Sequence, residues 1–554
     1  MKPDLFDNPI LRTKITSANV KAREALLGYF LGPFMAFISN AIFGSYLNRY
    51  YTDVIGLTNW APKFAVLMPI VSVLFVILGN LFIGRLIDMT RTSQGKARPY
   101  LLLSAPLVVI AMLLLFHSPN DGSAVTLIWI MVSYNLYYAI AYPFFYTSHS
   151  SMVALSTRNS RHRGILATFS NASGVAAIGI AASIVLPLFQ GFLFVTKNGG
   201  VDATASYQAW KNFIILICLI TFAGIVIEYF FTRERITEEN MKLNIREEKI
   251  PMLKQLKAVV SNRYWWLIML YFLLFQFGGM IKNGSMTYYC RWMFGAVDEA
   301  TAGSYQATLG LIGGLPTAIG MVLAWPIADK LGKQKAVVIG MIISVLGGLV
   351  SFMDVHSLVL VCAGVILKGV GSIPAMYVTL ALLSDVLDHL EAKNGFRSDG
   401  FTMSVYGAVM VGMTGLGSGC INIFLGLGGY DASLSVQSAG TQDALIICYL
   451  VMELVCYAII AGMLIFLDVE KHIPEDHKEI LELQKKRVLE AGGEWIEPAK
   501  RLQMEQEEAD RVTEEVRKEE LKARCQKKGL SFEAEEEKYQ AKLARKKRKA
   551  LKIE

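Results

Sequence analysis

Three ionisable side chains stand inside stretches of sequence that are otherwise apolar. Lys368 and Glu453 each lie about a dozen residues into such a stretch, and Lys282 lies nearer the end of another. Charge is costly in apolar surroundings, so a residue of this kind usually has a charged partner or binds an ion or a polar solute. Lys282 could instead extend its amine to a membrane surface, and Glu453 could be protonated and inert. The sequence alone does not place Lys368 beside Glu453.

A row of aromatic residues forms a second candidate site. Its members follow one another at steps of four, four, four and three, which puts them on one face of a helix. Such rings suit the apolar face of a sugar, and equally a flat aromatic solute, while packing between helices is the alternative. Pro143, within the row, removes a backbone hydrogen bond and is expected to bend the helix. The row consists of Tyr134, Tyr138, Tyr142, Tyr146 and His149.

Amide side chains inside other apolar stretches are candidates for the same solute path. An amide can hydrogen-bond a polar solute, and it can also simply bridge two helices. The predicted solute contacts are Asn40, Asn80, Tyr138, Tyr142, Tyr146, Asn171, Gln276, Lys282 and Lys368, with Asn422 as a further amide candidate.

A charged loop follows the second long apolar stretch and has a shorter counterpart later in the chain. Residues 84–100 read GRLIDMTRTSQGKARPY, and residues 327–336 read IADKLGKQKA. Both contain an Asp, then Gly-Lys, then further cations. Cations alone would suffice to keep a loop on one side of a membrane, so the carboxylates favour a gate, with topology as the alternative. The predicted gate residues in these loops are Asp88, Arg91, Lys96, Arg98, Asp329 and Lys333.

Composition assigns the chain to a class of protein. Of its 554 residues, 53% are hydrophobic and 18% are charged, and its mean hydropathy is +0.41. A helix that crosses a bilayer needs about 20 mostly apolar residues. Twelve such stretches predict an all-α membrane protein with twelve transmembrane helices. They lie near 26–50, 59–87, 99–118, 122–152, 163–193, 208–231, 263–287, 303–327, 335–354, 357–385, 400–427 and 442–467.

The distribution of Lys and Arg predicts the orientation. Connectors after even-numbered stretches are basic, whereas those after odd-numbered stretches contain only Lys197 and Arg291. Cationic loops stay in the cytoplasm, so both termini are expected there, as an even number of spans requires. The two matching charged loops further predict two six-helix halves arranged as parallel repeats, the major facilitator fold.

These observations divide the chain into five parts. A cytoplasmic N-terminal segment (1–25) precedes the N-terminal six-helix half (26–231), a cytoplasmic central linker (232–262), the C-terminal six-helix half (263–468) and a charged cytoplasmic tail (469–554).

The tail is half charged with almost no net charge, and it is expected to form polar helices broken at Gly492-Gly493 and Gly529. Its basic end could lie on anionic lipid headgroups, whereas a nucleic-acid partner is not expected. The seven cysteines have no paired spacing, so no metal site and no cofactor is expected.

Three motifs indicate a family. They are RYYTDVIGL at 49–57, the Thr-Arg and Gly-Lys-Ala-Arg-Pro of residues 90–99, and SDVLD at 384–388, with YPF at 142–144 and NGSMTYY at 283–289 in support. The chain resembles the glycoside–pentoside–hexuronide:cation symporters, whose best-known member is the melibiose permease, over all twelve stretches but not the tail. The resemblance implies the major facilitator fold and transport of a sugar or glycoside with a coupling cation. It also adds Asp385 and Asp388 to the predicted gate.

The chain departs from that family at its ion site. The positions that match the family's cation-site carboxylates are Val76, Asn80, Ala141 and Phe37, and a family lysine falls on Val411. A sodium ion needs several oxygen ligands with compensating negative charge, and a proton needs a group that titrates. The resemblance therefore implies that Na⁺ does not couple through the usual site.

We accordingly expect a transporter in the plasma membrane, not an enzyme, that moves a sugar- or glycoside-like solute across the lipid bilayer by alternating access. The coupling ion, H⁺ or Na⁺, stays open, with Lys368 and Glu453 as coupling candidates. Two alternatives also stay open: an uncoupled facilitator of a non-sugar solute, and a transporter-derived sensor or scaffold that acts through its tail.

Overall fold

The computed structural model of the chain describes residues 11–17, 19–90, 92, 94–157, 160–197, 200–235, 252–396, 399–490, 492 and 494–550. Within these ranges the protein is almost entirely helical, and the one described sheet is a two-stranded hairpin, β1 (Thr196–Lys197) with β2 (Gly200–Val201). Most of the predicted central linker lies outside the described residues.

The first half of the chain is a series of long helices, several of which contain a π-helical segment. Its elements are η3 (Glu24–Leu31), α1 (Gly32–Ile42), η4 (Phe43–Leu47), η5 (Tyr50–Val54), α2 (Leu57–Trp60), α3 (Pro62–Met89), α4 (Arg98–Phe116), α5 (Ala124–Asn135), η6 (Leu136–Ala141), α6 (Tyr142–Ser156), α7 (Ser160–Ala176), η7 (Ala177–Val185), α8 (Leu186–Leu193) and α9 (Ala203–Phe230).

The second half and the tail follow. The second half contains α11 (Met252–Val260), α12 (Arg263–Trp292), α13 (Glu299–Leu331), α14 (Lys333–Ser351), α15 (Leu358–Asn394), α16 (Asp399–Gly428), α17 (Ala439–Ile446), η8 (Ile447–Val451), α18 (Met452–Leu464) and η9 (Val469–Lys471). The tail contains α19 (Ile473–Glu490), α20 (Pro498–Lys528) and α21 (Phe532–Ala550). The expected breaks are present, because Gly492 and Gly529 have positive φ angles of 76° and 62°.

Ten of the described helical segments are long and apolar enough to cross a membrane. They match all the predicted stretches except 163–193 and 303–327. Both of these are helical, since Ser160–Leu193 forms α7, η7 and α8 without a break, and α13 covers the other stretch.

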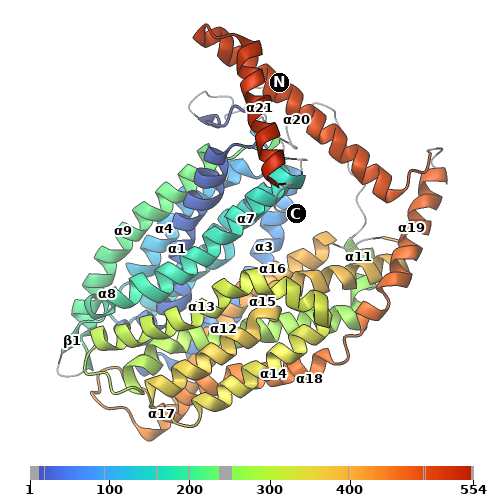
Figure 1. Cartoon of the computed structure of the whole chain (residues 1–554). Helices are drawn as coiled ribbons and strands as arrows, with labels where there is room; N and C mark the ends of the chain where they lie inside the picture. Colours follow the sequence, from blue (N-terminus) through green and yellow to red (C-terminus); the bar gives the residue numbers. More distant parts are fainter. Residues whose placement is uncertain are drawn as a thin grey trace.

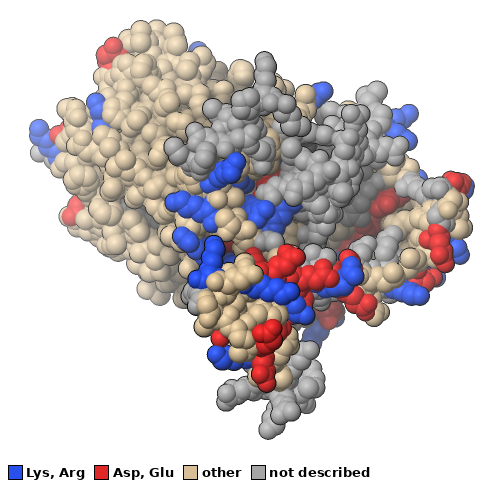
Figure 2. Space-filling view, turned by 90° about the horizontal axis from the view of Figure 1, so that it is seen from above, with Lys and Arg blue, Asp and Glu red and all other residues tan. Residues whose placement is uncertain are grey.

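The outer surface of the bundle suits contact with lipid. On α3, Leu67, Leu74, Leu78 and Phe82 are 56–65% exposed and lie on one face of the helix. Seen from above in Figure 2, charged side chains gather over the tail and the adjoining part of the bundle, whereas the bundle surface away from the tail carries few of them. An apolar surface of this extent would be unstable in water and is stable in a bilayer.

The two halves lie side by side with the tail at one end (Figure 1). We call the end of the bundle near α11 and α19 the tail end, and the opposite end, with β1 and α17, the far end. In Figure 1 the helices of the two halves lie closest together at the far end and spread apart toward the tail end. Contacts between the halves run mainly along α3 with α16 and along α8 with α13.

The matching loops predicted from sequence have the same local structure. Glu234, just after α9, accepts hydrogen bonds from the backbone N–H groups of Lys96, Ala97 and Arg98 at the start of α4, at 2.7–2.9 Å. Glu470 does the same for α14 in the second half.

Glu470, which follows α18, accepts the N–H groups of Lys333 and Gln334, both at 2.9 Å. The preceding glycines, Gly95 and Gly332, both have positive φ angles. Each half therefore fixes the first turn of its third long helix with a carboxylate from the end of its last one, where the partial positive charge of the helix terminus favours an anion.

Proline and glycine residues stand where helices are irregular or closely packed. The π-helical segment η6 ends directly before Tyr142 and Pro143 and lies within the tyrosine row. In the second half, Gly340 faces Gly371 and Gly347 faces Gly364, and a side chain at any of these positions would collide with the neighbouring backbone. These glycines allow α14 and α15 to pack closely.

Replacement of Glu234 or Glu470 by alanine should lower the apparent melting temperature of the purified protein. Each substitution leaves N–H groups at a helix start without an acceptor, which costs about 1–3 kcal/mol per helix. Glu490→Ala is the control, because its carboxylate lies on an exposed part of α19, 3.9 Å from the exposed Lys486. Equal melting temperatures for all three variants and the wild type would contradict a stabilising role for these carboxylates.

Candidate functional site

The three ionisable residues singled out in the sequence meet in one cluster. The Nζ atom of Lys368 lies 2.7 Å from Oε2 of Glu453, and the Nζ atom of Lys282 lies 3.2 Å from Oε1 of the same carboxylate. The Tyr457 hydroxyl donates to Oε1 at 3.0 Å. Lys368 and Glu453 are almost fully buried, whereas the Lys282 side chain is 27% exposed. The cluster carries two positive charges against one negative charge, and Lys282 is its accessible member.

Three helices position this cluster. Lys282 lies on α12, Lys368 on α15 and Glu453 on α18. Gly278, one turn before Lys282, contacts the α18 backbone at Glu453, so the absence of a side chain there lets α12 and α18 approach. A lysine at this depth without the carboxylate would be strongly unfavourable. The pairing therefore also holds the three helices together.

The tyrosine row is a packed stack rather than an open surface. Tyr134 and Tyr138 have ring centroids 4.5 Å apart, and Tyr142 stacks on Tyr146 at 5.8 Å. Tyr134, Tyr138 and Tyr142 are buried, and contact of Tyr138 or Tyr142 with a solute stays a prediction. Tyr146 is half-buried and donates to the Met410 sulfur of the second half at 3.5 Å, which places it where the two halves meet.

The predicted amide contacts do not come together. Asn40 and Gln276 are half-buried, Asn171 is exposed, and Asn80 donates to the Val76 carbonyl of its own helix at 2.8 Å. These four residues form no hydrogen bond with one another within the described part of the chain. Their contact with a solute stays a prediction.

Neutral side chains occupy the positions that match the family's ion site. Val76 and Ala141 are buried in the apolar core of the first half, and Val411 packs against the same core. Phe37 is half-buried and packs edge-on against the rings of Phe145 and His149. No carboxylate stands at these described positions.

The predicted gate residues form contacts within their own halves. Lys333 donates to both carboxylate oxygens of Asp385 at 2.6 and 2.7 Å. Arg98 is fully buried, donates to the Tyr229 carbonyl at 3.0 Å near the end of α9, and lies over the Tyr229 ring. The cations of the loops thus reach a carboxylate and a helix C-terminus, and a gate role for these residues stays a prediction.

The remaining predicted gate residues either have other surroundings or lie outside the residues that the structure describes. Lys96 uses its N–H to cap α4, Asp329 is exposed, and Asp388 lies 3.4 Å from His477 of the tail. Arg91 and the side chain of Asp88 lie outside the described residues.

A buried charged network joins the two halves at the far end. Glu299 at the start of α13 accepts from Arg49 at 2.8 Å and from Arg291 at 2.9 Å, and Arg49 also pairs with Asp53 at 2.9 Å. All four side chains are at most 5% exposed. Tyr430 of the second half donates to Asp53 at 3.0 Å. Two arginines and two carboxylates balance one another, so the network can remain away from water.

Neutral residues extend this far-end network. Gln190 of the first half donates to Glu299 at 2.9 Å, and Asn48 donates to Asn422 of the second half at 3.0 Å. The amide candidate Asn422 is thus already hydrogen-bonded between the halves. These contacts hold the far end closed in this structure.

Sequence reasoning missed the far-end network. Arg49 and Asp53 were noted only as part of the RYYTDVIGL motif, and Arg291 only as one of two cations on odd-numbered connectors. A cation in a region otherwise without them was the available signal. Glu299 gave none, because an acid at a helix start is usually a simple terminal residue.

Asp298, next to Glu299, has a local role. It caps α13 by accepting the Thr301 N–H at 2.7 Å, and the backbone and side-chain hydrogen bonds from Thr301 lower the pKa of Asp298.

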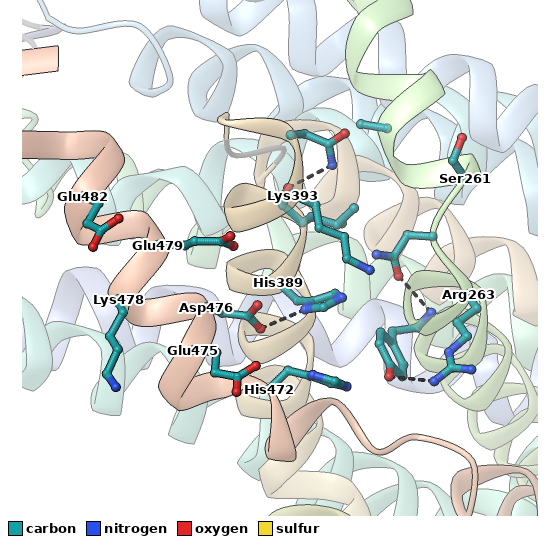
Figure 3. Close-up of a pocket in the computed structure, with 15 residues that line it drawn as sticks. Ser261, Arg263, His389, Lys393, His472, Glu475, Asp476, Lys478, Glu479 and Glu482 are labelled. Atoms are coloured by element: carbon teal, nitrogen blue, oxygen red, sulfur yellow. Dashed lines mark hydrogen bonds and ion pairs between the residues drawn. The ribbon is translucent and has the colours of Figure 1, made fainter. Parts of the chain in front are cut away.

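A cavity of about 890 Å³ lies at the tail end, between the second half and α19 (Figure 3). Its walls carry both signs of charge, with Arg263 and Lys393 on the bundle side and Glu475, Glu479 and Glu482 on α19. His389 and Asp476 lie between them and pair at 2.8 Å. This cavity belongs to the contact between bundle and tail rather than to the region between the halves.

A comparison with known families now places the chain. The family model described as MFS/sugar transport protein matches residues 28–471. The chain belongs to this family. It is therefore a multi-pass transporter of the cell membrane and not an enzyme, and its relatives and structural neighbours agree.

Among curated relatives, the isoprimeverose transporter of Lactiplantibacillus pentosus is 26% identical over 475 residues, covering 83% of this chain and 91% of the relative. A putative glycoside/cation symporter of Escherichia coli (strain K12) is 26% identical over 435 residues, covering 77% of this chain and 86% of the relative. The chain resembles both over nearly the whole membrane region. These likenesses confirm the family resemblance inferred from the motifs.

Solved structures show the same fold at much lower identity. A bacterial homologue of the human lysosomal transporter Spinster has a TM-score of 0.54 at 13% identity, covering 84% of this chain and 99% of that one. The nucleoside transporter NupG has a TM-score of 0.52 at 11% identity, covering 80% and 99%. The transporter thus has the major facilitator fold.

Substitution Glu453→Gln should destabilise the transporter strongly. It leaves the buried Lys368 ammonium without a carboxylate, which costs about 3–5 kcal/mol. The double variant Lys368→Gln/Glu453→Gln should recover part of this loss, because it removes the unpaired charge. Thermal unfolding in detergent measures both, with Glu475→Gln on the exposed surface of α19 as the control. A double variant less stable than Glu453→Gln would contradict the pairing.

Substitution Glu299→Gln should open the far end. It removes the carboxylate that links Arg49 to Arg291 and leaves Asp53, which pairs with Arg49, as the remaining carboxylate of the network. Cys290 is fully buried beside this network and interacts with Arg49. Labelling of Cys290 by a membrane-impermeant maleimide should rise several-fold in Glu299→Gln. Asp298→Asn is the matched control, because asparagine also caps a helix. Equal protection of Cys290 in both variants would argue against the network as a seal.

Proposed function

We propose that the transporter moves a sugar- or glycoside-like solute by alternating access between two six-helix halves. The observation that carries this proposal is the far-end network, which bridges the halves through Arg49 and Glu299. Among the described residues of the tail end, Lys333 pairs with Asp385 within the second half, and His389 pairs with Asp476 of the tail. The buried pair of Arg49 and Glu299, by contrast, bridges the halves at the far end, as expected for one of two alternating states.

The proposal includes twelve membrane-spanning helices with both termini in the cytoplasm. The ten candidate spans and the helices over 163–193 and 303–327 support the count. The basic loops of residues 84–100 and 327–336 lie at the tail end, which supports a cytoplasmic tail end. The structure then corresponds to a state that is closed to the outside.

The solute site is proposed at the half-buried side chains between the halves. Tyr146 offers an aromatic face, and Lys282 offers an ammonium. The carboxylate of Glu453, which pairs with this ammonium, also pairs with Lys368. The cluster has one positive charge in excess, which would favour a glycoside with a carboxylate over a neutral one. The names of relatives are consistent with this class, since they include an isoprimeverose transporter and a glucuronide carrier homologue.

The proposal includes coupling to an ion, but it excludes coupling to Na⁺ through the family's cation site. The positions of that site carry Val76, Asn80, Ala141 and Phe37, which provide no carboxylate. Lys368 and Glu453 remain coupling candidates through their buried pair.

Counterflow in proteoliposomes tests the transport proposal. Purified transporter loaded with unlabelled isoprimeverose, lactose, raffinose or a methyl β-glucuronide should take up the same labelled solute faster than protein-free liposomes for at least one of them. Replacement of Na⁺ by K⁺ should leave the rate unchanged. Absence of counterflow for all four solutes with folded protein would reject a glycoside as solute, and Na⁺-dependent accumulation would reject the account of the ion site.

A further inference from the structure

A second buried cluster of titratable residues lies in the first half. Nδ1 of His149 on α6 lies 2.7 Å from Oε1 of Glu228 on α9, and its Nε2 lies 2.9 Å from Oγ of Ser170 on α7. His149 is 4% exposed, Ser170 8% and Glu228 fully buried. Three helices thus bring a carboxylate, an imidazole and a hydroxyl into one hydrogen-bonded chain. His149 entered the sequence analysis only as the last member of the aromatic row.

The serine lets the imidazole change its protonation without losing a hydrogen bond. When His149 carries a proton only on Nδ1, Nε2 accepts the Ser170 hydroxyl; when both nitrogens are protonated, Nε2 donates to the same oxygen. Glu228 accepts from Nδ1 in both states. The pair of imidazole and carboxylate can therefore take up one proton, passing from one negative charge to neutral, while no other bond breaks.

Glu228 also has an unused oxygen. Its Oε2 atom is buried and accepts no hydrogen bond from any residue that the structure describes. A buried acceptor without a donor is unfavourable, and a positive charge on the neighbouring imidazole would offset the uncompensated negative charge of this carboxylate. In the second half, by contrast, Glu453 uses one oxygen for Lys368 and the other for Lys282 and Tyr457.

The groups that surround the His149–Glu228 pair are aromatic rings or charges that are already paired. Phe37 packs edge-on against the imidazole at 5.2 Å between ring centroids, and Phe145 stacks against it from the same helix. Facing from η3, Tyr29 interacts with Glu228 and hydrogen-bonds the Met152 carbonyl. The next charges beyond Tyr29 pair with each other, Glu24 with Arg235 at 2.7 Å. Histidine changes charge near neutral pH more readily than any of these.

The site lies beside the place where the family resemblance puts a carboxylate. Phe37 occupies that position and separates His149 from the region where Tyr146 contacts the second half. A shift of the Phe37 ring would connect the imidazole with that region, and its present position closes it off.

We propose that His149, Glu228 and Ser170 form the coupling site of this transporter and bind one proton. Solute and proton would cross together because the site and the proposed solute surface share Phe37 as their common wall. The inference has two parts. Its binding arm, the uptake of a proton by these residues, rests on the described geometry, and its transport arm, the coupling of that proton to the solute, rests on the proposed function.

The binding arm is measured without any solute. Infrared difference spectra between acidic and neutral buffer, recorded on the purified full-length transporter in lipid, should show a carboxyl band and an imidazole band that titrate together. Glu228→Gln should lose the carboxyl band, and His149→Gln should displace its midpoint. His117→Gln is the matched control, because His117 only hydrogen-bonds the Leu113 carbonyl in α4. Variants that titrate as the wild type overturn the proposal.

The transport arm uses labelled isoprimeverose in proteoliposomes with an imposed pH gradient. Wild type and His117→Gln should accumulate the sugar and acidify the interior, whereas His149→Gln and Glu228→Gln should lose accumulation but keep counterflow. Gradient-driven accumulation by Glu228→Gln overturns the coupling site. If wild-type counterflow fails, the proposed solute class fails, and the infrared titration still decides the proton site.

A milder substitution tests the same site in case the His149 and Glu228 variants do not fold. Ser170→Ala should fold and should shift the pH midpoint of accumulation, because the neutral imidazole loses its donor. Ser148→Ala is its control, since the Ser148 hydroxyl is buried on the same helix as His149 and has no hydrogen-bond partner among the described residues. Equal midpoints for the two serine variants contradict the role of Ser170.

Discussion

A charge inside an apolar bilayer is stable only when it is paired, and this constraint shapes the transporter from one end to the other. Lys368 and Lys282 share Glu453, Arg49 and Arg291 share Glu299, and His149 pairs with Glu228. Each pairing joins helices that are far apart in sequence. The groups best suited to bind an ion or solute are therefore also the groups that fix the arrangement of the bundle.

Both halves place a buried pair of ionisable residues on the same two helices of the repeat, but the residue types of the pair differ. In both, the fourth and sixth long helices carry the buried pair: α6 with α9 in the first half, and α15 with α18 in the second. The first pair combines an imidazole with a carboxylate that has an unused oxygen. The second combines two lysines with a carboxylate whose two oxygens are both engaged. This difference is the basis of the proton site proposed in the first half and of the solute contact proposed at Lys282 in the second.

The tail links both halves at the end where they spread apart. On α19, Asp476 pairs with His389 of the second half, and on α20, Glu520 pairs with Lys21 before the first half. A rocking motion between the halves would have to bend or release this link. The charge-rich composition of the tail suits such a role, because exposed ion pairs contribute little stability and form and break easily.

The sequence by itself determined the helical membrane class, the repeat, the family and three of the ionisable residues within spans, Lys282, Lys368 and Glu453. These follow from hydropathy, spacing and local motifs, which depend on neighbouring residues in the chain. Only the tertiary structure decided which charges meet. Glu299 is an ordinary helix-start acid until Arg49, 250 positions earlier, pairs with it across the halves. Likewise, His149 is one ring in an aromatic row until α9 brings Glu228 to it, because the partner of a buried charge is chosen by helix packing and not by sequence distance.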